Sequence, residues 1–219
     1  RRLGLPGLRA CFDEWNSGRG VDILYNGTVA KRKDAMVVSE GYCVVVSTTP
    51  MSRSTGPDGE PFHYCEVKIE DDGGTWAGGL DVGVTALAPG DVGKADHECL
   101  SWAELPSTWV VNSTGQLRIK GRSVPPGAIG PMSMKMAGYN SAVFEYRDVV
   151  GLKVERNALS LYLNGGLIGS LELGEHGGIP VGGDLYLVAD VAGMCVEMSI
   201  PDATWATRRM EKEAKTGLY

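Results

Sequence analysis

The sequence predicts an all-β protein, an antiparallel β-sandwich with a short C-terminal helix. The prediction rests on a surplus of glycine, on turn signals at short intervals and on alternation of apolar and polar residues between them. The chain of 219 residues contains 31 glycines, against a usual frequency of roughly 7%. Because each glycine costs a helix interior about 1 kcal/mol relative to alanine, a helix bundle is not expected. The hydrophobic fraction of 43% is high enough to form a core.

Turn dipeptides such as Asn26-Gly27 and Asp58-Gly59 separate segments of strand length. These dipeptides adopt the positive φ angles of tight hairpin turns. Between them apolar and polar residues alternate, which is typical of sheets with one buried face. Strands are therefore expected at residues 21–25, 28–32, 35–38, 42–48, 62–70, 78–86, 108–112, 116–120, 149–155, 158–163, 167–173, 184–191 and 194–200. The last two are expected to form an antiparallel hairpin.

A segment near the C-terminus departs from this pattern. Residues 203–216 lack turn residues, follow Asp202, a favourable N-cap, and end before Gly217, a favourable C-terminal residue for a helix. They are expected to form a short helix.

The length of the chain suits one β-sandwich domain. We expect an N-terminal extension over 1–16, the sandwich domain over 17–201 and a helix with its tail over 202–219; because the chain begins without Met, it is expected to be a fragment or a processed product.

Charge and cysteine content exclude several classes of function. The net charge is −6, and the longest basic run is Lys31-Arg32-Lys33. A nucleic-acid partner is therefore not expected. Membrane insertion is not expected either, because no apolar stretch approaches the roughly 18 residues of a spanning helix. The five cysteines form no CxxC pair, which argues against a disulfide framework or a zinc site and favours a reducing compartment.

Candidate catalytic groups are few. His63 and Cys65 lie two positions apart on one expected strand and therefore share a face, which raises the possibility of a Cys-His dyad. A cysteine on a strand is more often a small core residue, and that interpretation is preferred. The common nucleophile and nucleotide-binding motifs are absent from the sequence. We expect no catalytic residue, no metal and no cofactor.

Carboxylates offer a second catalytic hypothesis. Glu66 and Glu70 share a face of the expected strand 62–70, as the acid pair of a glycosidase would. Lys68 stands between them on that face, and a solvated face is expected instead. The acidic turn from Asp71 to Gly74 suggests a calcium loop, but calcium ligands are usually more widely spaced, so a plain tight turn is expected.

The order of several motifs resembles that of a Neuralized homology repeat (NHR) domain. The motifs are SGRGVDILYNGTVAKRKD from residue 17, WAGGLDVGVT from 76, LYLNGG from 161 and ADVAGMC from 189. The resemblance covers about residues 17–200. The sequence departs from the family pattern at Ala192, where Tyr is usual, in an insertion around 51–61, and in a long segment over 121–147. The resemblance implies a SPRY-like (concanavalin-like jelly-roll) sandwich that binds proteins.

The long loops are the expected binding surface, because a rigid scaffold with variable loops suits recognition. They are residues 49–61, 88–107 and 121–147. Met132, Met134 and Met136 form either an adaptable interface strip or a strand edge. The candidate partner-binding residues are Arg53, Asp58, Asp91, His97, Trp102, Met134 and Tyr139.

The expected function is that of a non-catalytic protein-protein interaction domain. The resemblance implies a substrate-recognition or scaffolding module of ubiquitin-ligase or centriolar proteins, placed in the cytoplasm or at the cytoskeleton, centriole or cilium. Two alternatives remain open at this point: a structural subunit of a large cytoskeletal or membrane-associated assembly, and a carbohydrate-binding sandwich.

Overall fold

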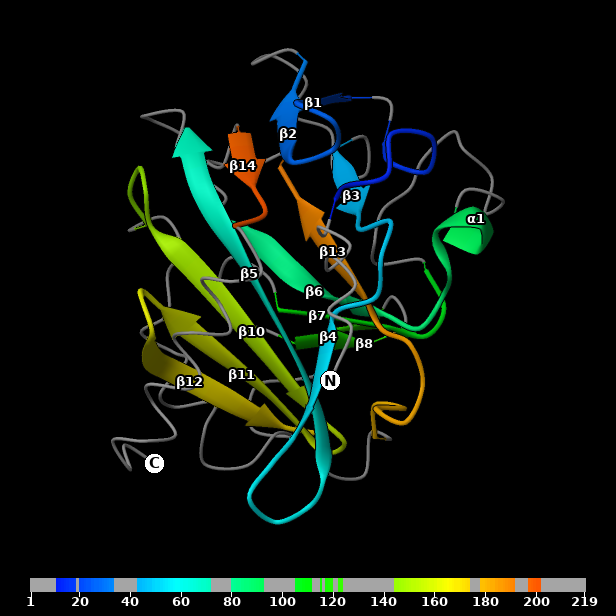
Figure 1. Ribbon diagram of the computed structural model, residues 1–219, viewed down its shortest axis with the longest axis vertical. Helices are drawn as coiled ribbons and strands as arrows, with labels where there is room; N and C mark the ends of the chain where they lie inside the picture. The colour runs from blue at the N-terminus through cyan, green and yellow to red at the C-terminus, as the bar shows by residue number, and fades with distance from the viewer. Residues whose placement is uncertain are drawn as a thin grey trace, which may run out of the picture.

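A computed structural model describes residues 11–18, 20–33, 43–71, 80–92, 105–111, 115, 117–119, 122–123, 144–173, 178–191 and 197–201. These residues form two antiparallel sheets and a short helix, α1, at Pro89–Val92 (Figure 1). The expected antiparallel β-sandwich is thus confirmed. No helix in these ranges is long and apolar enough to cross a membrane. The expected strand 35–38, the expected helix 203–216 and Ala192 lie outside the described residues.

The larger sheet has eight strands in the order β1-β2-β14-β5-β10-β11-β12, and β4 pairs with part of β5. Its longest strand, β5, runs the height of the molecule in Figure 1 and pairs with β14, β10 and β4. Its strands are β1 (Val21–Leu24), β2 (Val29–Arg32), β4 (Ser52–Thr55), β5 (Pro61–Asp71), β10 (Val149–Glu155), β11 (Ala158–Leu163), β12 (Gly166–Glu172) and β14 (Glu197–Ser199).

The smaller sheet has six strands in the order β3-β13-β6-β7-β8-β9. They are β3 (Val44–Val46), β6 (Asp81–Thr85), β7 (Thr108–Val111), β8 (Leu117–Ile119), β9 (Arg122–Ser123) and β13 (Tyr186–Asp190). Segment 12–18 covers the outer edge of β3, where Asp13 N donates to Val46 O at 2.8 Å and Gly18 N donates to Val44 O at 2.7 Å.

The main core lies between the two sheets. Alternating residues of β5, β10 and β11 face it, including Val67, Leu152 and Leu161, each about 1% exposed. A second, smaller apolar cluster covers the other face of the six-stranded sheet, where Val46 and Val110 pack with Val92 of α1. A sheet buried on both faces needs apolar residues at successive positions, which explains the runs of valine in β3 and β7.

Most expected strands are present, and β10 and β11 have the expected bounds. Other expectations are wrong. The segments 88–107 and 121–147 are not loop throughout, because Pro89–Val92 form α1 and Arg122–Ser123 form β9. The expected hairpin of 184–191 with 194–200 does not exist, because β13 lies in the six-stranded sheet and β14 in the eight-stranded sheet. The segment 49–61 is not loop throughout, because Ser52–Thr55 form β4, which pairs with Pro61–Tyr64 of β5. β4 consists of polar residues, so it lacks the apolar alternation on which the prediction depended.

Candidate interaction surface

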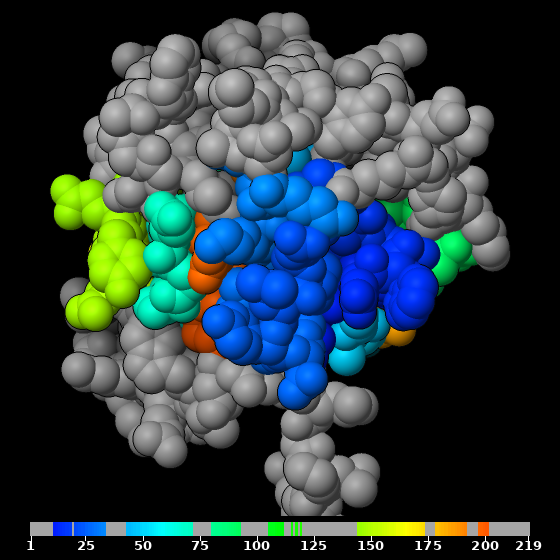
Figure 2. Space-filling view, turned by 90° about the horizontal axis from the view of Figure 1, so that it is seen from above, coloured from blue at the N-terminus to red at the C-terminus, as the bar shows by residue number. Residues whose placement is uncertain are grey.

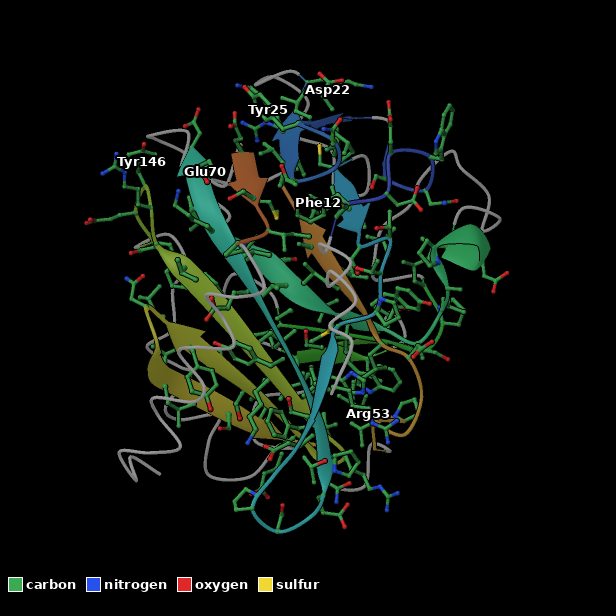
Figure 3. All side chains as sticks on the ribbon, in the orientation of Figure 1. Phe12, Asp22, Tyr25, Arg53, Glu70 and Tyr146 are labelled. Carbon is green, nitrogen blue, oxygen red and sulfur yellow. The ribbon has the colours of Figure 1, made fainter. Side chains whose placement is uncertain are left out.

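Two exposed tyrosines flank one end of the eight-stranded sheet. The side chains of Tyr25 and Tyr146 are 74% and 53% exposed. Figure 3 shows both at the upper end of the molecule, with Asp22 and Glu70. From above, Figure 2 shows 144–150, the end of β5, β14 and the β1–β2 hairpin side by side. We call this area the tyrosine-flanked surface, and its residues are Tyr25, Lys31, Glu70, Tyr146, Arg147, Glu197 and Ser199.

The β1–β2 turn holds Tyr25 in a strained conformation. Tyr25 has φ +52°, Asn26 +58° and Gly27 +86°. Left-handed backbone is uncommon for a bulky residue, so the surrounding structure must impose it. A Cβ at Gly27 would lie 2.8 Å from Cys11 Cβ, and Thr28 Oγ1 donates to Tyr25 O at 2.9 Å. The turn is therefore fixed on both sides, and the tyrosine ring is held outside the core.

The turn before β10 holds Tyr146 in a comparable way. Glu145 N donates to Asp148 Oδ2 at 2.8 Å, and Asn164 Nδ2 donates to Asp148 Oδ1 at 2.7 Å. Arg147 has φ +75°, its backbone N donates to Ile69 O at 2.8 Å, and its guanidinium carbon lies 4.9 Å from the centre of the Tyr146 ring. Backbone bonds to β5 therefore pre-organise this tyrosine.

Charged side chains are paired within and between the strands that lie between the two turns. Lys31 Nζ lies 2.9 Å from Glu197 Oε2. Glu70 accepts from Lys68 Nζ at 2.8 Å and from Ser199 Oγ at 2.6 Å. The surface thus presents rigid aromatic groups around a largely balanced set of charges.

These contacts shift two pKa values. The hydrogen bond with Glu197 raises the pKa of Lys31. Partial burial alone would raise the pKa of the Glu70 carboxyl group, but the hydrogen bonds from Lys68 and Ser199 outweigh it, so the pKa lies below its ordinary value. Both groups are therefore held in their charged forms near neutral pH.

The residues predicted to bind a partner do not gather at this surface. Arg53 lies toward the opposite end (Figure 3), where its Nη1 donates to Gly182 O at 3.0 Å. Asp58 lies in the β4–β5 turn, and its Oδ1 accepts from Glu60 N at 3.2 Å. Asp91 is exposed on α1, beside the other sheet. The remaining candidates, His97, Trp102, Met134 and Tyr139, lie outside the described residues.

His63 and Cys65 take structural positions on the inner face of β5. His63 is buried, with Nε2 3.0 Å from Val181 O and Nδ1 3.5 Å from Met51 O, so both ring nitrogens face main-chain carbonyls. Burial raises the pKa of the Cys65 thiol far above its ordinary value. Such a thiol is not an activated nucleophile, so the pair does not form a catalytic dyad.

The expected solvated face around Glu66 is wrong. Glu66 is only 3% exposed and accepts a hydrogen bond from Tyr64 Oη at 2.7 Å. Its cross-strand neighbour is Gly151, where a Cβ would lie 2.5 Å from that Oη, so the glycine makes room for the tyrosine. A buried Glu66 is not available to a sugar, which removes the observation behind the carbohydrate hypothesis. Asp71 ends β5, and the rest of the Asp71–Gly74 turn lies outside the described residues. Within the described residues, no group of three His, Cys, Asp or Glu residues is placed to hold a metal ion.

The two packed sheets and the exposed turns characterise the chain as a β-sandwich domain with rigid aromatic side chains at one end. The family model of Neuralized matches residues 12–202. The chain therefore belongs to the Neuralized family, as its motifs indicated. A search of curated proteins found none that matches this chain.

Two solved structures of NHR domains show the same fold. The crystal structure of the Drosophila melanogaster neuralized-NHR1 domain is similar to this chain with a TM-score of 0.58 and 16% identity, covering 90% of this chain and 99% of that one. The solution structure of the NEUZ (NHR) domain in Neuralized from Drosophila melanogaster gives a TM-score of 0.60 and 16% identity, covering 93% and 97%. The TRIM65 PSpry domain also matches, with a TM-score of 0.49 and 13% identity, covering 89% and 90%.

Sequence reasoning identified the turn that carries Tyr25 but not the role of the tyrosine. Asn26-Gly27 marks the turn, whereas neither the exposed ring nor the strained backbone has a sequence signature. Tyr146 was missed because its turn is fixed by Asn164 and Ile69, which are distant in the sequence.

Proposed function

We propose that this chain is a non-catalytic protein-interaction domain that binds its partner through the tyrosine-flanked surface. The observation that carries the proposal is the pair of exposed tyrosines, Tyr25 and Tyr146, each on a turn with a left-handed residue held by hydrogen bonds. A pre-ordered aromatic side chain gives up little conformational entropy on binding, and tyrosine is enriched at binding hot spots. Membership of the Neuralized family supports the same class of function.

The partner is proposed to be the substrate of a ubiquitin-ligase assembly, and this chain the domain that recognises it in the cytoplasm. A scaffold role at the cytoskeleton, centriole or cilium is the alternative within this class. The two roles differ in the fate of the partner. Recognition for ubiquitination predicts that expression of the protein lowers the partner's abundance and that a proteasome inhibitor restores it, whereas a scaffold leaves the abundance unchanged.

The binding test begins with affinity capture from cells, followed by measurement with the purified partner. Each tyrosine contributes through its ring, so Tyr25→Ala with Tyr146→Ala is expected to weaken the affinity at least about tenfold, the loss expected when hot-spot aromatics are truncated. Leu167→Ala is the matched control, because Leu167 is also a large exposed residue (59%) but lies on β12. If the double variant is folded and binds within about twofold of the wild type, the proposed surface is wrong.

A further inference from the structure

One side-chain amide joins two turns that lie apart in the sequence. Asn164, at the tip of the β11–β12 hairpin, donates from Nδ2 to Asp148 Oδ1 at 2.7 Å and accepts at Oδ1 from Val149 N at 3.0 Å. Its backbone N donates to Val149 O at 2.8 Å. The hairpin tip is thereby attached to the turn that carries Tyr146. We call the contact between the two side chains the Asp148–Asn164 link.

The link holds the Tyr146 turn through one carboxylate. Asp148 Oδ2 accepts from Glu145 N at 2.8 Å while Oδ1 accepts from Asn164, so the two oxygens connect the start of the turn with the hairpin. Hydrogen bonds to a charged group are the stronger kind. An ionised carboxylate has acceptors alone, so only a donor can stand opposite Asp148 Oδ1. The order of the Tyr146 turn therefore depends in part on Asn164 remaining an amide.

The residue after Asn164 makes that amide chemically labile. Asparagine is among the thermolabile residues, and Gly165 has no side chain to shield its nitrogen. Leu163 and Gly166 are register partners, so Asn164 and Gly165 form the tip of a two-residue hairpin turn. In the described part of the chain Gly165 N donates to no main-chain carbonyl, and Gly165 is half-exposed. Water can therefore reach this N–H and remove its proton.

The other Asn-Gly pair among the described residues differs in both respects. Gly27 N donates to Leu24 O at 3.1 Å, so its proton is already engaged. Val149 N faces the side-chain oxygen of Asn164, which is the arrangement that stabilises negative charge developing on a carbonyl oxygen. Within the described ranges, no donor faces the side-chain oxygen of Asn26. The fold thus favours attack on Asn164 over attack on Asn26.

We propose that Asn164 is a modification site at which spontaneous deamidation releases the Tyr146 turn. Gly165 N, once deprotonated, bonds to Asn164 Cγ, and Nδ2 takes up a proton from water and leaves as ammonia. Water then opens the cyclic imide at one of its two carbonyls. The product is aspartate, or its isomer in which the chain runs through the side chain. Either product carries one additional negative charge, and the reaction consumes only water.

The new carboxylate stands where the amide donated. Two ionised carboxylates at the 2.7 Å that now joins Asp148 to Asn164 repel strongly. The contact opens, Asp148 is drawn away from Glu145 N, and the Tyr146 ring loses its fixed position. The inference rests on the proposed function in one respect, because a partner senses this change only if it binds the tyrosine-flanked surface.

The reaction itself is tested by mass, without a partner. The whole folded chain is kept in mildly alkaline buffer at physiological temperature, and peptide mass analysis follows conversion at each asparagine. We expect Asn164 to convert faster than Asn26, and Asn157, which precedes Ala158, to convert more slowly than either. In urea the two Asn-Gly pairs should convert at similar rates, because the fold no longer distinguishes them. Conversion of Asn164 no faster than that of Asn157, or slower than that of Asn26, would overturn the proposal.

The effect on the turn is tested with Asn164→Asp, which reproduces the charge of the product. Hydrogen exchange of the Arg147 and Asp148 amides should become at least about tenfold faster, the factor that corresponds to a lost hydrogen bond to a charged group. Asn157→Asp, on the β10–β11 turn, is the matched control and should leave these amides unchanged. Asp148→Asn combined with Asn164→Asp exchanges amide and carboxylate, so donor and acceptor meet again and exchange should return to within about twofold of the wild type. Unchanged exchange in Asn164→Asp, or no recovery in the combined variant, would overturn the role of the link.

Titration with the purified partner completes the test. The deamidated chain and Asn164→Asp are expected to lose about as much affinity as Tyr146→Ala, and the combined variant with Asp148→Asn is expected to recover it. If Tyr146→Ala weakens binding and Asn164→Asp does not, the proposed release of Tyr146 is wrong. If neither alters binding, the tyrosine-flanked surface is wrong, while the mass and exchange results still decide whether Asn164 is modified and whether it holds the turn.

Discussion

Tyr64 donates a hydrogen bond to Glu66 at 2.7 Å, and both side chains are buried although they lie on the strand face opposite the inter-sheet core. The Tyr64 ring also packs edge to face on Tyr162, with 6.1 Å between ring centres. This part of the eight-stranded sheet is thus a buried polar and aromatic cluster rather than a solvated face.

Removal of the Tyr64 hydroxyl is expected to destabilise the fold. Tyr64→Phe keeps the ring but leaves the buried Glu66 Oε1 without this donor, and the loss of a hydrogen bond to a buried acceptor costs about 1–3 kcal/mol. Urea unfolding should show a loss of this size, whereas Tyr25→Phe, an exposed control, should change the free energy of unfolding by less than about 0.5 kcal/mol. Equal effects of the two substitutions would mean that the bond contributes nothing.

Gly151 is expected to tolerate no side chain. A Cβ there would lie 2.5 Å from Tyr64 Oη and 3.2 Å from Tyr162 Cβ, so Gly151→Ala must displace the tyrosine, and overpacking of this kind costs about 1–3 kcal/mol. Gly182→Ala is the control, because nothing lies within 4 Å of a Cβ at that position. Thermal unfolding distinguishes the two. A Gly151→Ala protein as stable as Gly182→Ala would contradict the packing described.

The strain at Tyr25 predicts that stability and binding respond in opposite directions. Asparagine tolerates a φ of +52° better than tyrosine does, so Tyr25→Asn should leave the free energy of unfolding unchanged or raise it slightly. The same substitution removes an exposed ring and should weaken partner binding. Denaturant unfolding and titration calorimetry measure the two quantities; loss of both together would show that Tyr25 serves the fold.

Glu70 gives the protein a pH-dependent contribution. Its pKa is lowered in the folded state, so its stabilising effect is complete above the ordinary glutamate pKa of about 4.3 and disappears as the pH falls through the lower, folded value. Glu70→Gln should therefore reduce stability at pH 7, by up to about 1 kcal/mol for a partly exposed pair, and cost nothing near pH 2. Glu145→Gln, at an exposed position, is the matched control; a Glu70→Gln deficit that persists near pH 2 would refute the ion-pair explanation.

Two cysteines are expected to resist alkylation in the native state. Burial, helped by the charge of Asp190, raises the pKa of Cys43 to about 11, and burial raises that of Cys65 still further. At pH 8 only about a thousandth of Cys43 would be thiolate, the reactive form. Iodoacetamide followed by peptide mass analysis should label Cys11 before Cys43 and Cys65; Cys43 is buried, whereas Cys11 and Cys65 are both partly exposed, so the raised pKa is what protects Cys65. Labelling of Cys43 as rapid as that of Cys11 would show that Cys43 is not buried, and equally rapid labelling of Cys65 would show that the pKa of its thiol is not raised.

Local patterns predicted the strands better than their arrangement. The bounds of β10 and β11 follow from apolar alternation on both sides of a short turn. β4 escaped prediction because Ser52–Thr55 is polar and is a strand only through its pairing with β5. Alternation also identified β13 and β14, but it carries no information on which sheet a strand joins, so the expected hairpin was wrong.

The candidate site was harder to predict, because long-range contacts decide which side chains are free. Arg53, a predicted partner-binding residue, is exposed, and its guanidinium also donates to Gly182 O, 129 positions away in the sequence. Glu66 was expected in solvent, yet it is 3% exposed and accepts a hydrogen bond from Tyr64. Such contacts require the folded structure, whereas the turn at Asn26-Gly27 is evident from two residues.

Hydrogen exchange of the chain with and without its purified partner tests the tyrosine-flanked surface most directly. The amides of Gly27, Thr28, Arg147 and Asp148 are hydrogen-bonded in the free protein, so their exchange is slow enough to follow. We predict that the partner slows exchange in 24–28 and 145–148 together and leaves the β4–β5 turn at 56–60 unchanged. Protection at 56–60 with none at the two tyrosine turns would contradict the proposed surface.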